Sequence, residues 1–183
     1  MKKYAMKIQS PRLLLRWLRP DDLDDFLAYR SDPIVMRYQS MSPMRREEAA
    51  SFIKGQMDNE WGRVGGYQQI GIERRSDGKL IGDCALKIQA AEPRIAEVGY
   101  TVNRDFQGQG FATEAVRALI GELFTSIEVH KIIALVDVRN PASFRVLEKL
   151  GFTREGHLRK SYYDEVDGDW FDEYWYGLLR EEW

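Results

Sequence analysis

The spacing of hydrophobic and polar positions changes several times along the chain, and each spacing predicts a type of element. From residue 110 to 125 the apolar side chains recur at helical spacing, which predicts an amphipathic helix. The run KIIALVDV at 131–138 is almost continuously apolar, which is typical of a buried strand. By the same reasoning we expect further helices at 19–30, 42–61 and 141–151, a short helical turn within 31–38, and strands at 12–18, 67–74, 80–88, 95–102, 152–163 and 171–179.

Signals at the ends of these segments complete the expected fold. Ser42 and Pro43 are typical of the N-cap and first residue of a helix, and Gly151 of the residue that follows one. The turns RSDGK and VDGDW predict two hairpins. The order of elements predicts one α+β domain over residues 1–183, with a mixed, mostly antiparallel sheet flanked by helices. Within it, the strand–helix–strand segment 95–138 is expected to be a right-handed parallel crossover.

Composition narrows the classes of function. The 183 residues are 44% hydrophobic, enough for a core, and their net charge of −2 argues against binding nucleic acid through phosphate neutralisation. Cys84 is the single cysteine, so an internal disulfide is excluded and a zinc cluster is not expected. No stretch approaches the roughly 18 apolar residues that span a bilayer, and the basic start MKKYAMKIQSPR lacks the apolar core of a signal peptide. We therefore expect a soluble cytoplasmic protein with no metal, membrane or nucleic-acid partner.

A run of small residues stands where the strand at 95–102 gives way to the helix at 110–125. The first N–H groups of a helix have no partner within it and lie at the positive end of its dipole, so they form a ready anion site. Gly108 and Gly110 allow the backbone to approach a phosphate, Ala112 keeps the first turn narrow, and Thr113 can add a hydroxyl. The pattern is neither a Walker loop nor the three-glycine dinucleotide fingerprint. The alternative interpretation is a glycine turn that only helps the helix to pack.

The segment QGQGFA (107–112) resembles the Q/R-x-x-G-x-G/A motif of the GNAT superfamily of acyl-CoA N-acyltransferases. Six segments resemble, in order, parts of the ribosomal-protein N-terminal acetyltransferases of the RimJ/RimL type: SPRLLLR (10–16), DPIVMRY (32–38), AEVGYTV (96–102), FQGQGFATEAV (106–116), NPASFRVLEKLGF (140–152) and DGDWFDEYWYGLL (167–179). The resemblance implies a GNAT fold and acetyl-CoA as the donor. It also implies that the pyrophosphate is held by the turn made of Gln107, Gly108, Gln109, Gly110, Phe111, Ala112 and Thr113.

Direct transfer of an acetyl group from a thioester to an amine needs no metal, but it needs a polarised carbonyl and a neutral amine. In the family, the strand before the turn splays from the next parallel strand and the cofactor's arm lies in the gap. Freed N–H groups near Val98, Gly99 and Tyr100 are then expected to bond the carbonyl oxygen. Amines are largely protonated at neutral pH, so a base is needed. Glu97 lies on the strand face opposite Val98 and Tyr100 and is the candidate base; the alternative is an ordinary glutamate of a polar face.

The departing thiolate needs a proton or a hydrogen-bond donor. The resemblance places Asn140 beside the cofactor's arm and Ser143 near its sulfur, although Asn140 also has the local pattern of a helix N-cap before Pro141. Tyr162 and Tyr163 are equal rivals of Ser143 for the acid, because many family members use a tyrosine.

The acceptor is the least determined part of the sequence. Residues 164–173 hold six acidic and no basic side chains, which predicts either a surface that attracts a cationic acceptor or a solvated loop. The resemblance favours the N-terminal α-amine of a protein, and a polyamine or an aminoglycoside is the alternative. A non-catalytic module that binds acyl-CoA, and a homodimer, are also left open.

Overall fold

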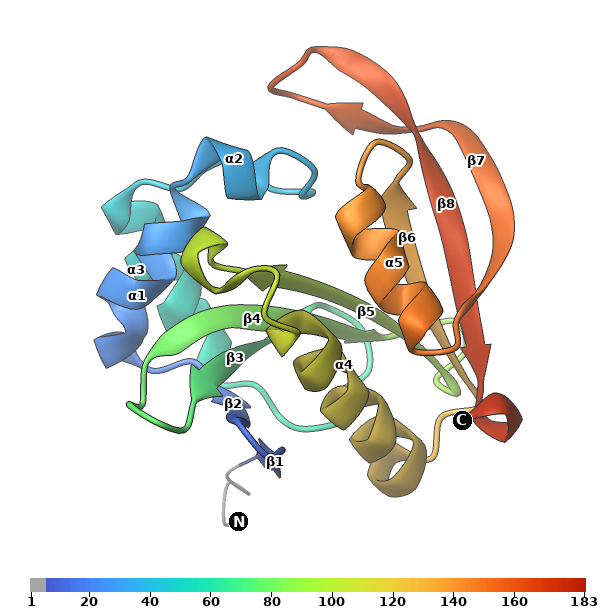
Figure 1. Cartoon of the computed structure of the whole chain (residues 1–183), viewed down its shortest axis with the longest axis horizontal. Coiled ribbons are helices and arrows are strands. Elements are labelled where there is room, and N and C mark those ends of the chain that lie inside the picture. Colours follow the sequence, from blue (N-terminus) through green and yellow to red (C-terminus); the bar gives the residue numbers. More distant parts are fainter. Residues whose placement is uncertain (1–5) are drawn as a thin grey trace.

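A computed structural model describes residues 6–183, so the first five residues of the basic start lie outside the described part of the chain. The strands are β1 (Lys7–Gln9), β2 (Leu13–Trp17), β3 (Gln68–Arg74), β4 (Leu80–Ile88), β5 (Ile95–Val102), β6 (Lys131–Asp137), β7 (Thr153–Asp164) and β8 (Asp169–Leu179). They form one eight-stranded sheet in the order β1-β2-β3-β4-β5-β6-β8-β7 (Figure 1). Only the β5–β6 pair is parallel, which confirms the predicted mixed sheet and the parallel crossover.

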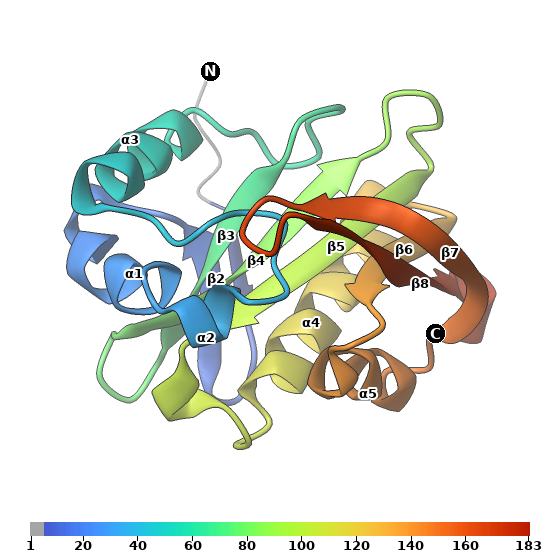
Figure 2. The same ribbon diagram turned by 90° about the horizontal axis from the view of Figure 1, so that it is seen from above.

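Helices cover both faces of this sheet (Figure 2). On one face lie α1 (Leu23–Arg30) and α3 (Arg46–Gln56), with α2 (Pro33–Met36) beside α1; on the other lie α4 (Phe111–Glu122) and α5 (Pro141–Lys149). Short helical turns complete the chain at η1 (Pro20–Asp22), η2 (Arg104–Phe106), the π-helical η3 (Leu123–Ile127) and η4 (Arg180–Glu182). Each face of the sheet is therefore covered by its own set of helices.

The core is divided in the same way. Leu119 and Ile120 of α4 are fully buried in the larger cluster, which also holds the Cys84 thiol. The smaller cluster joins Phe26 of α1 to Ile53 of α3. Burial of this apolar surface, at about 25 cal/mol per Å², fixes each helical layer on its own face of the sheet.

In the N-terminal half, one predicted helix is shorter than expected and one strand was not predicted. The helix predicted over 42–61 spans only Arg46–Gln56, because the N–H of Met44 donates to the carbonyl oxygen of Arg30 (2.8 Å) and holds the preceding residues outside the helix. The helix starts where Glu48 accepts a hydrogen bond from the N–H of Arg45 (2.7 Å), as in a capping box. The short β1 strand was not predicted. Its three residues pair with β2 and are too few to show a period.

The closing hairpin of β7 and β8 curves over the sheet toward segment 37–43, which links α2 to α3 (Figure 2). The hydroxyl of Tyr162 on β7 donates to the main-chain oxygen of Gln39 (3.1 Å). Two segments more than a hundred residues apart thus meet above β5 and β6.

Candidate active site

Strands β5 and β6 separate half-way along their length. Their pairing ends at Glu97 and Ile133, whereas β5 continues to Val102 beside β4 and β6 continues to Asp137 beside β8. Main-chain groups alternate sides along a strand. The N–H of Asn103 donates to Ile81 of β4 (2.8 Å), so the main-chain groups of Tyr100 point the other way, toward β6. The N–H of Tyr100 therefore faces the gap beyond the last pair, where the sequence places a donor for a carbonyl oxygen.

The glycine turn is built for an anion. Gly108 and Gly110 have φ of 72° and 80°, and a Cβ at Gly108 would meet nothing within 4 Å. Gly110 is the N-cap of α4 and has no side chain to cap the helix. The N–H groups of Phe111, Ala112 and Thr113 in the first turn are therefore available to a ligand. Open space before the turn and these main-chain donors together fit a pyrophosphate.

Arg12 on the turn before β2 holds this loop from behind. Its Nε lies 2.6 Å from Glu114 of α4, its Nη1 donates to the oxygen of Gln109 (3.1 Å), and its guanidinium lies over the ring of Phe111. Ser10 also donates to Glu114 (2.7 Å). Sequence reasoning missed this role, since only the fold brings residues a hundred positions apart together. The side chain of Gln107, from the quoted motif, donates to the oxygen of Val102 (2.9 Å) and fixes the start of the turn.

Ser143, in the first turn of α5, lies on the α4–α5 side of the gap. The Tyr100 hydroxyl donates to the main-chain oxygen of Ser143 (2.7 Å) and lies 2.9 Å from its Oγ. Burial raises the pKa of Tyr100, so its hydroxyl keeps its proton at neutral pH. Asn140 is the N-cap of α5, because its side chain accepts the N–H of Ser143 (3.2 Å). The Tyr100 hydroxyl is a further proton donor that the sequence did not single out.

A cavity of about 640 Å³ opens on the opposite face of the sheet, at the mouth of the gap. Residues from both arms of the gap and from the closing hairpin line it, among them Tyr67, Glu97, Tyr100, Asp137, Tyr162 and Glu173. Val98 and Gly99 also line it. The four consecutive residues of β5 that the sequence selected, Glu97 to Tyr100, therefore all border this cavity.

Three carboxylates from three strands face this cavity. Glu97 accepts hydrogen bonds from the Tyr67 hydroxyl (2.6 Å) and the Gln89 amide (2.9 Å). Glu173 on β8 is the direct cross-strand neighbour of Asp137 on β6. Burial raises the pKa of Glu173, and the nearby charges of Asp137 and Glu97 act in the same direction. The sequence counted Glu173 only within an acidic run, because its place in the site depends on the adjacency of β6 and β8.

A buried ion pair forms the floor of the cavity. Arg30 of α1 and Asp83 of β4 lie 2.6 Å apart, and their side chains are 3% and 0% exposed. Asp83 also accepts hydrogen bonds from the Tyr29 hydroxyl (2.6 Å) and the Gln69 amide (2.5 Å). With its oxygens filled in this way, Asp83 supports the floor and is not free to bind a ligand.

The two candidate tyrosines lie in different places. Tyr162 lines the cavity, and its pKa is raised by burial and by the charges of Asp164 and Asp137. Tyr163 is 45% exposed, packs against Trp170, and lines only a second cavity of about 240 Å³ beneath the hairpin tip.

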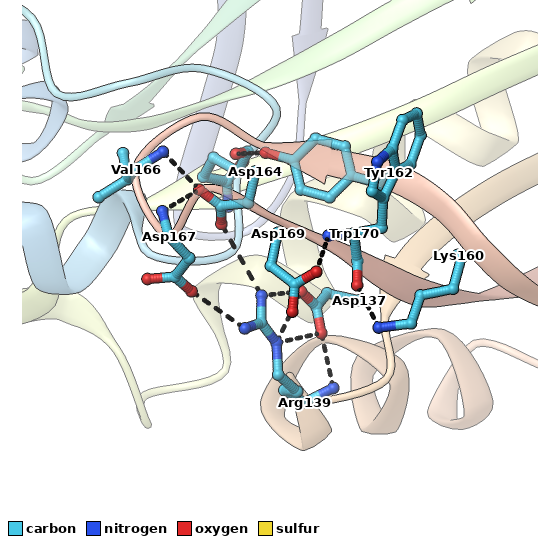
Figure 3. Close-up of polar contacts among 10 residues, drawn as sticks. Asp137, Arg139, Lys160, Tyr162, Asp164, Val166, Asp167, Asp169 and Trp170 are labelled. Atoms are coloured by element: carbon cyan, nitrogen blue, oxygen red, sulfur yellow. Dashed lines mark hydrogen bonds and ion pairs between the residues drawn. The ribbon is translucent and has the colours of Figure 1, made fainter.

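The acidic tip of the hairpin is tied to one arginine (Figure 3). Arg139, in the loop after β6, contacts Asp137 (2.6 Å) and Asp167 (3.1 Å), and it lies 3.8 Å from Asp164. Asp164 also accepts the N–H groups of Val166 and Asp167. Asp164 and Asp167 of the tip therefore already have partners within the protein. This weakens the interpretation of residues 164–173 as an open cation-binding surface.

Within residues 6–183, no three His, Cys, Asp or Glu side chains form a group that could hold a metal ion. Over the same range, none of the helices is both long and apolar enough to cross a membrane.

A strand gap with the first N–H groups of α4 on one face and a carboxylate-lined cavity on the other fits a protein that moves a group from a phosphate-bearing donor. The acetyltransferase (GNAT) domain family matches residues 12–153. The uncharacterized N-acetyltransferase p20 of Bacillus licheniformis is 34% identical over 176 residues, which cover 96% of this chain and 97% of that protein. The chain therefore belongs to the GNAT acetyltransferases, and it is an acetyl-CoA-dependent N-acetyltransferase.

Two solved structures and one further relative extend the comparison. A GNAT-family acetyltransferase from Bacillus anthracis superposes with a TM-score of 0.88 at 29% identity, covering 97% of this chain and all of that one. The spermidine N-acetyltransferase of Vibrio cholerae, in complex with CoA and spermine, has a TM-score of 0.78 at 26% identity, covering 94% and 98%. The ribosomal protein uS5-alanine N-acetyltransferase of Escherichia coli is 27% identical over 128 residues, covering 69% of this chain and 65% of that protein. The two named acceptors differ, a ribosomal protein and a polyamine.

Proposed function

We propose that this acetyltransferase acts on the N-terminal α-amine of a protein, as the resemblance to the RimJ/RimL type implies. The observation that carries the proposal is the acidic cavity at the mouth of the β5–β6 gap, on the sheet face opposite α4 and α5. Donor and acceptor then approach the gap from opposite faces. Their reacting groups meet beside Glu97 and Tyr100.

The donor site follows from the turn and the gap. The main-chain N–H groups from Gly108 to Thr113 would hold the pyrophosphate of acetyl-CoA, and the gap would take its arm. Once bound, acetyl-CoA supplies an activated thioester. The N–H of Tyr100 faces the gap and would bond the carbonyl oxygen as it gains charge. Asn140 and Ser143, at the start of α5, would line the arm.

The chain's own side chains would move the protons. A carboxylate of the cavity takes one proton from the ammonium group of the acceptor; Glu97 was selected for this from the sequence. The Tyr100 and Ser143 hydroxyls, hydrogen-bonded to each other on the donor face, supply the proton that the departing sulfur needs. Tyr162, which also lines the cavity, remains the tyrosine rival of Ser143 for this role.

The two cavities favour a polypeptide acceptor. The smaller cavity shares Gln39, Ser40, Met41 and Tyr162 with the larger one, so a polypeptide that enters the larger cavity would have a second hollow beside it, toward the hairpin tip. The second candidate is a small cationic amine such as a polyamine, which the carboxylates at Glu97, Asp137 and Glu173 also fit.

The test is an acetylation screen read by intact mass. The protein is incubated with acetyl-CoA and a panel of short peptides with free or blocked N-termini, together with polyamines and aminoglycosides. We expect a gain of one acetyl group on peptides with a free N-terminus and release of free CoA. Modification confined to small amines would favour the second candidate. Absence of transfer to every acceptor would overturn the proposed function.

A further inference from the structure

We propose that Glu173, rather than Glu97, is the residue that takes the proton from the acceptor's ammonium group, and that Glu97 acts on Glu173 only through its negative charge. This inference rests on the function proposed above. It departs from the sequence-based choice, and it follows from how the two carboxylates are held.

Both oxygens of Glu97 are already engaged. The Tyr67 hydroxyl donates to Oε1 (2.6 Å) and the Gln89 amide donates to Oε2 (2.9 Å). Burial and the bond to Glu97 raise the pKa of Tyr67, so its hydroxyl keeps its proton and continues to donate. A carboxylate held from both sides is fixed in place, and turning it toward an amine in the cavity would break one of these hydrogen bonds.

Glu173 is held from one side only. The hydroxyl of Ser161 donates to its Oε2 (2.9 Å), and within residues 6–183 no hydrogen bond reaches its Oε1. Its side chain is half-buried and lines the cavity at the far arm of the gap, next to Asp137 on β6. One oxygen therefore remains free to accept a proton from an amine in the cavity, directly or through one water.

The surroundings of Glu173 favour its protonation. The charged and titratable groups that act on it or line the same cavity come from every surrounding element: Glu97 and Tyr100 on β5, Asp137 on β6, Tyr162 on β7, Tyr67 before β3, Tyr38 after α2, and the Arg30–Asp83 pair of the floor. Burial is the largest cause of its raised pKa; the charges of Asp137 and Glu97 add to it, and the bond from Ser161 opposes it. A carboxylate whose pKa is moved toward neutrality is better matched to proton transfer than one at its ordinary value.

In the transfer reaction, one N–H proton of the acceptor's ammonium group passes to Oε1 of Glu173 and leaves later to solvent. The freed nitrogen lone pair attacks the thioester carbonyl, a C–N bond forms and the C–S bond breaks. The nitrogen passes its second proton to water, the sulfur takes one from the Tyr100 and Ser143 hydroxyls, and water returns a proton to this hydroxyl pair, so that one proton in all is released to solvent.

The experiment is the pH dependence of kcat at saturating acetyl-CoA and acceptor, using the best acceptor from the screen above. Glu173→Gln should lower kcat at neutral pH by about 10²–10⁴-fold. The loss should shrink as pH rises, because the amine then deprotonates by itself. Acetyl-CoA affinity, measured by calorimetry, should stay unchanged and shows that the variant is folded. Glu181→Gln, an equal charge change at an exposed position in η4, is the matched control.

Two neighbours provide the sharper readout. Ser161→Ala removes a bond that lowers the pKa of Glu173, so the acidic limb of the profile should move to higher pH. Glu97→Gln removes a negative charge that raises this pKa, so the limb should move to lower pH while turnover persists. Opposite shifts are expected only if Glu173 is the titrating base, and a merely structural role would produce neither.

The opposite result would overturn this inference. If Glu97→Gln abolishes the acidic limb and Glu173→Gln keeps the wild-type profile, Glu97 is the base and the inference is wrong. Should Glu173→Gln fail to fold, Glu173→Asp with the two neighbour variants gives the same decision, because it retains a carboxylate with an altered reach. A wild-type protein that acetylates nothing would instead refute the proposed function.

Discussion

The two sides of the β5–β6 gap are built in contrasting ways. On the α4–α5 side, most parts suited to acetyl-CoA come from one stretch of chain, the end of β5, the short η2 and the turn at 107–113, and only Asn140 and Ser143 are added from α5. On the opposite side, the cavity is assembled from the segments at 38–41, 67–69, 83–85, 97–101 and 135–137, with Tyr162 and Glu173 from the closing hairpin. A site formed by contiguous residues can be recognised in a sequence, whereas one formed by tertiary contacts cannot. The predictions below test this contrast in order of expected effect.

The largest effect is expected at the floor of the assembled side. Asp83→Ala leaves the Arg30 guanidinium buried without its partner, and removing one member of a buried pair costs about 3–5 kcal/mol. The free energy of unfolding from a urea titration measures it. Asp77→Ala, which breaks a surface pair with Arg74, is the control and should change stability little. A stable Asp83→Ala protein would mean that the floor does not depend on this pair.

The next effect concerns the hydroxyl pair at the gap. Tyr100→Phe and Ser143→Ala should each lower kcat by about 10²-fold without changing acetyl-CoA affinity, because both remove the donor that the sulfur needs. The double variant should be little worse than either single one, since residues that act as a unit are not additive. Tyr163→Phe, on the exposed side of the hairpin, tests the rival acid and should keep its turnover. Independent, multiplicative losses would show that the two hydroxyls do not work together.

A smaller effect is expected on the contiguous side. Ala112→Asp places a negative charge in the first turn of α4, beside the expected pyrophosphate, and should weaken acetyl-CoA binding about tenfold, or ~1.4 kcal/mol. Gly110→Val tests the same turn, but its φ of 80° makes any side chain strained, so folding must be checked as well. Gly121→Asp puts the same charge at the other end of α4, in open space, and serves as the control. Equal affinity in Ala112→Asp would place the phosphates elsewhere.

Local signals explain how much of the fold could be predicted. The strands at 80–88 and 95–102 were placed to the residue, and Gly151 does end α5 with φ of 88°. Each of these depends on a period or a backbone conformation that nearby residues determine. The helix at 42–61 failed because Ser42 and Pro43 fit a helix start locally, whereas the contact of Met44 with the end of α1 decides against it.

The residues of the candidate site also differ in whether the sequence could predict them. Glu97 was selected from strand alternation beside the expected splay, and the N–H of Tyr100 from the splay that the family resemblance implies. Glu173 could not be selected, because the period along β8 does not reveal that this strand lies beside β6 and brings a carboxylate next to Asp137. Arg12 could not be assigned for the same reason: its contact with Glu114 joins positions 102 residues apart.

The smallest effect tests the acidic tip of the hairpin. The sequence predicts that neutralising Asp164, Glu165 and Asp167 raises KM for cationic acceptors. The structure sharpens this prediction to Glu165, which is exposed, because Asp164 and Asp167 already contact Arg139 (Figure 3). Glu165→Gln should raise KM for a basic peptide by an amount worth about 1 kcal/mol or less, and added salt should reduce the difference, since exposed charges are screened within about 8–10 Å. KM for a basic and a neutral peptide, at low and high salt, measures it. An equal change for the two peptides would leave recognition of a cation to the carboxylates of the cavity alone.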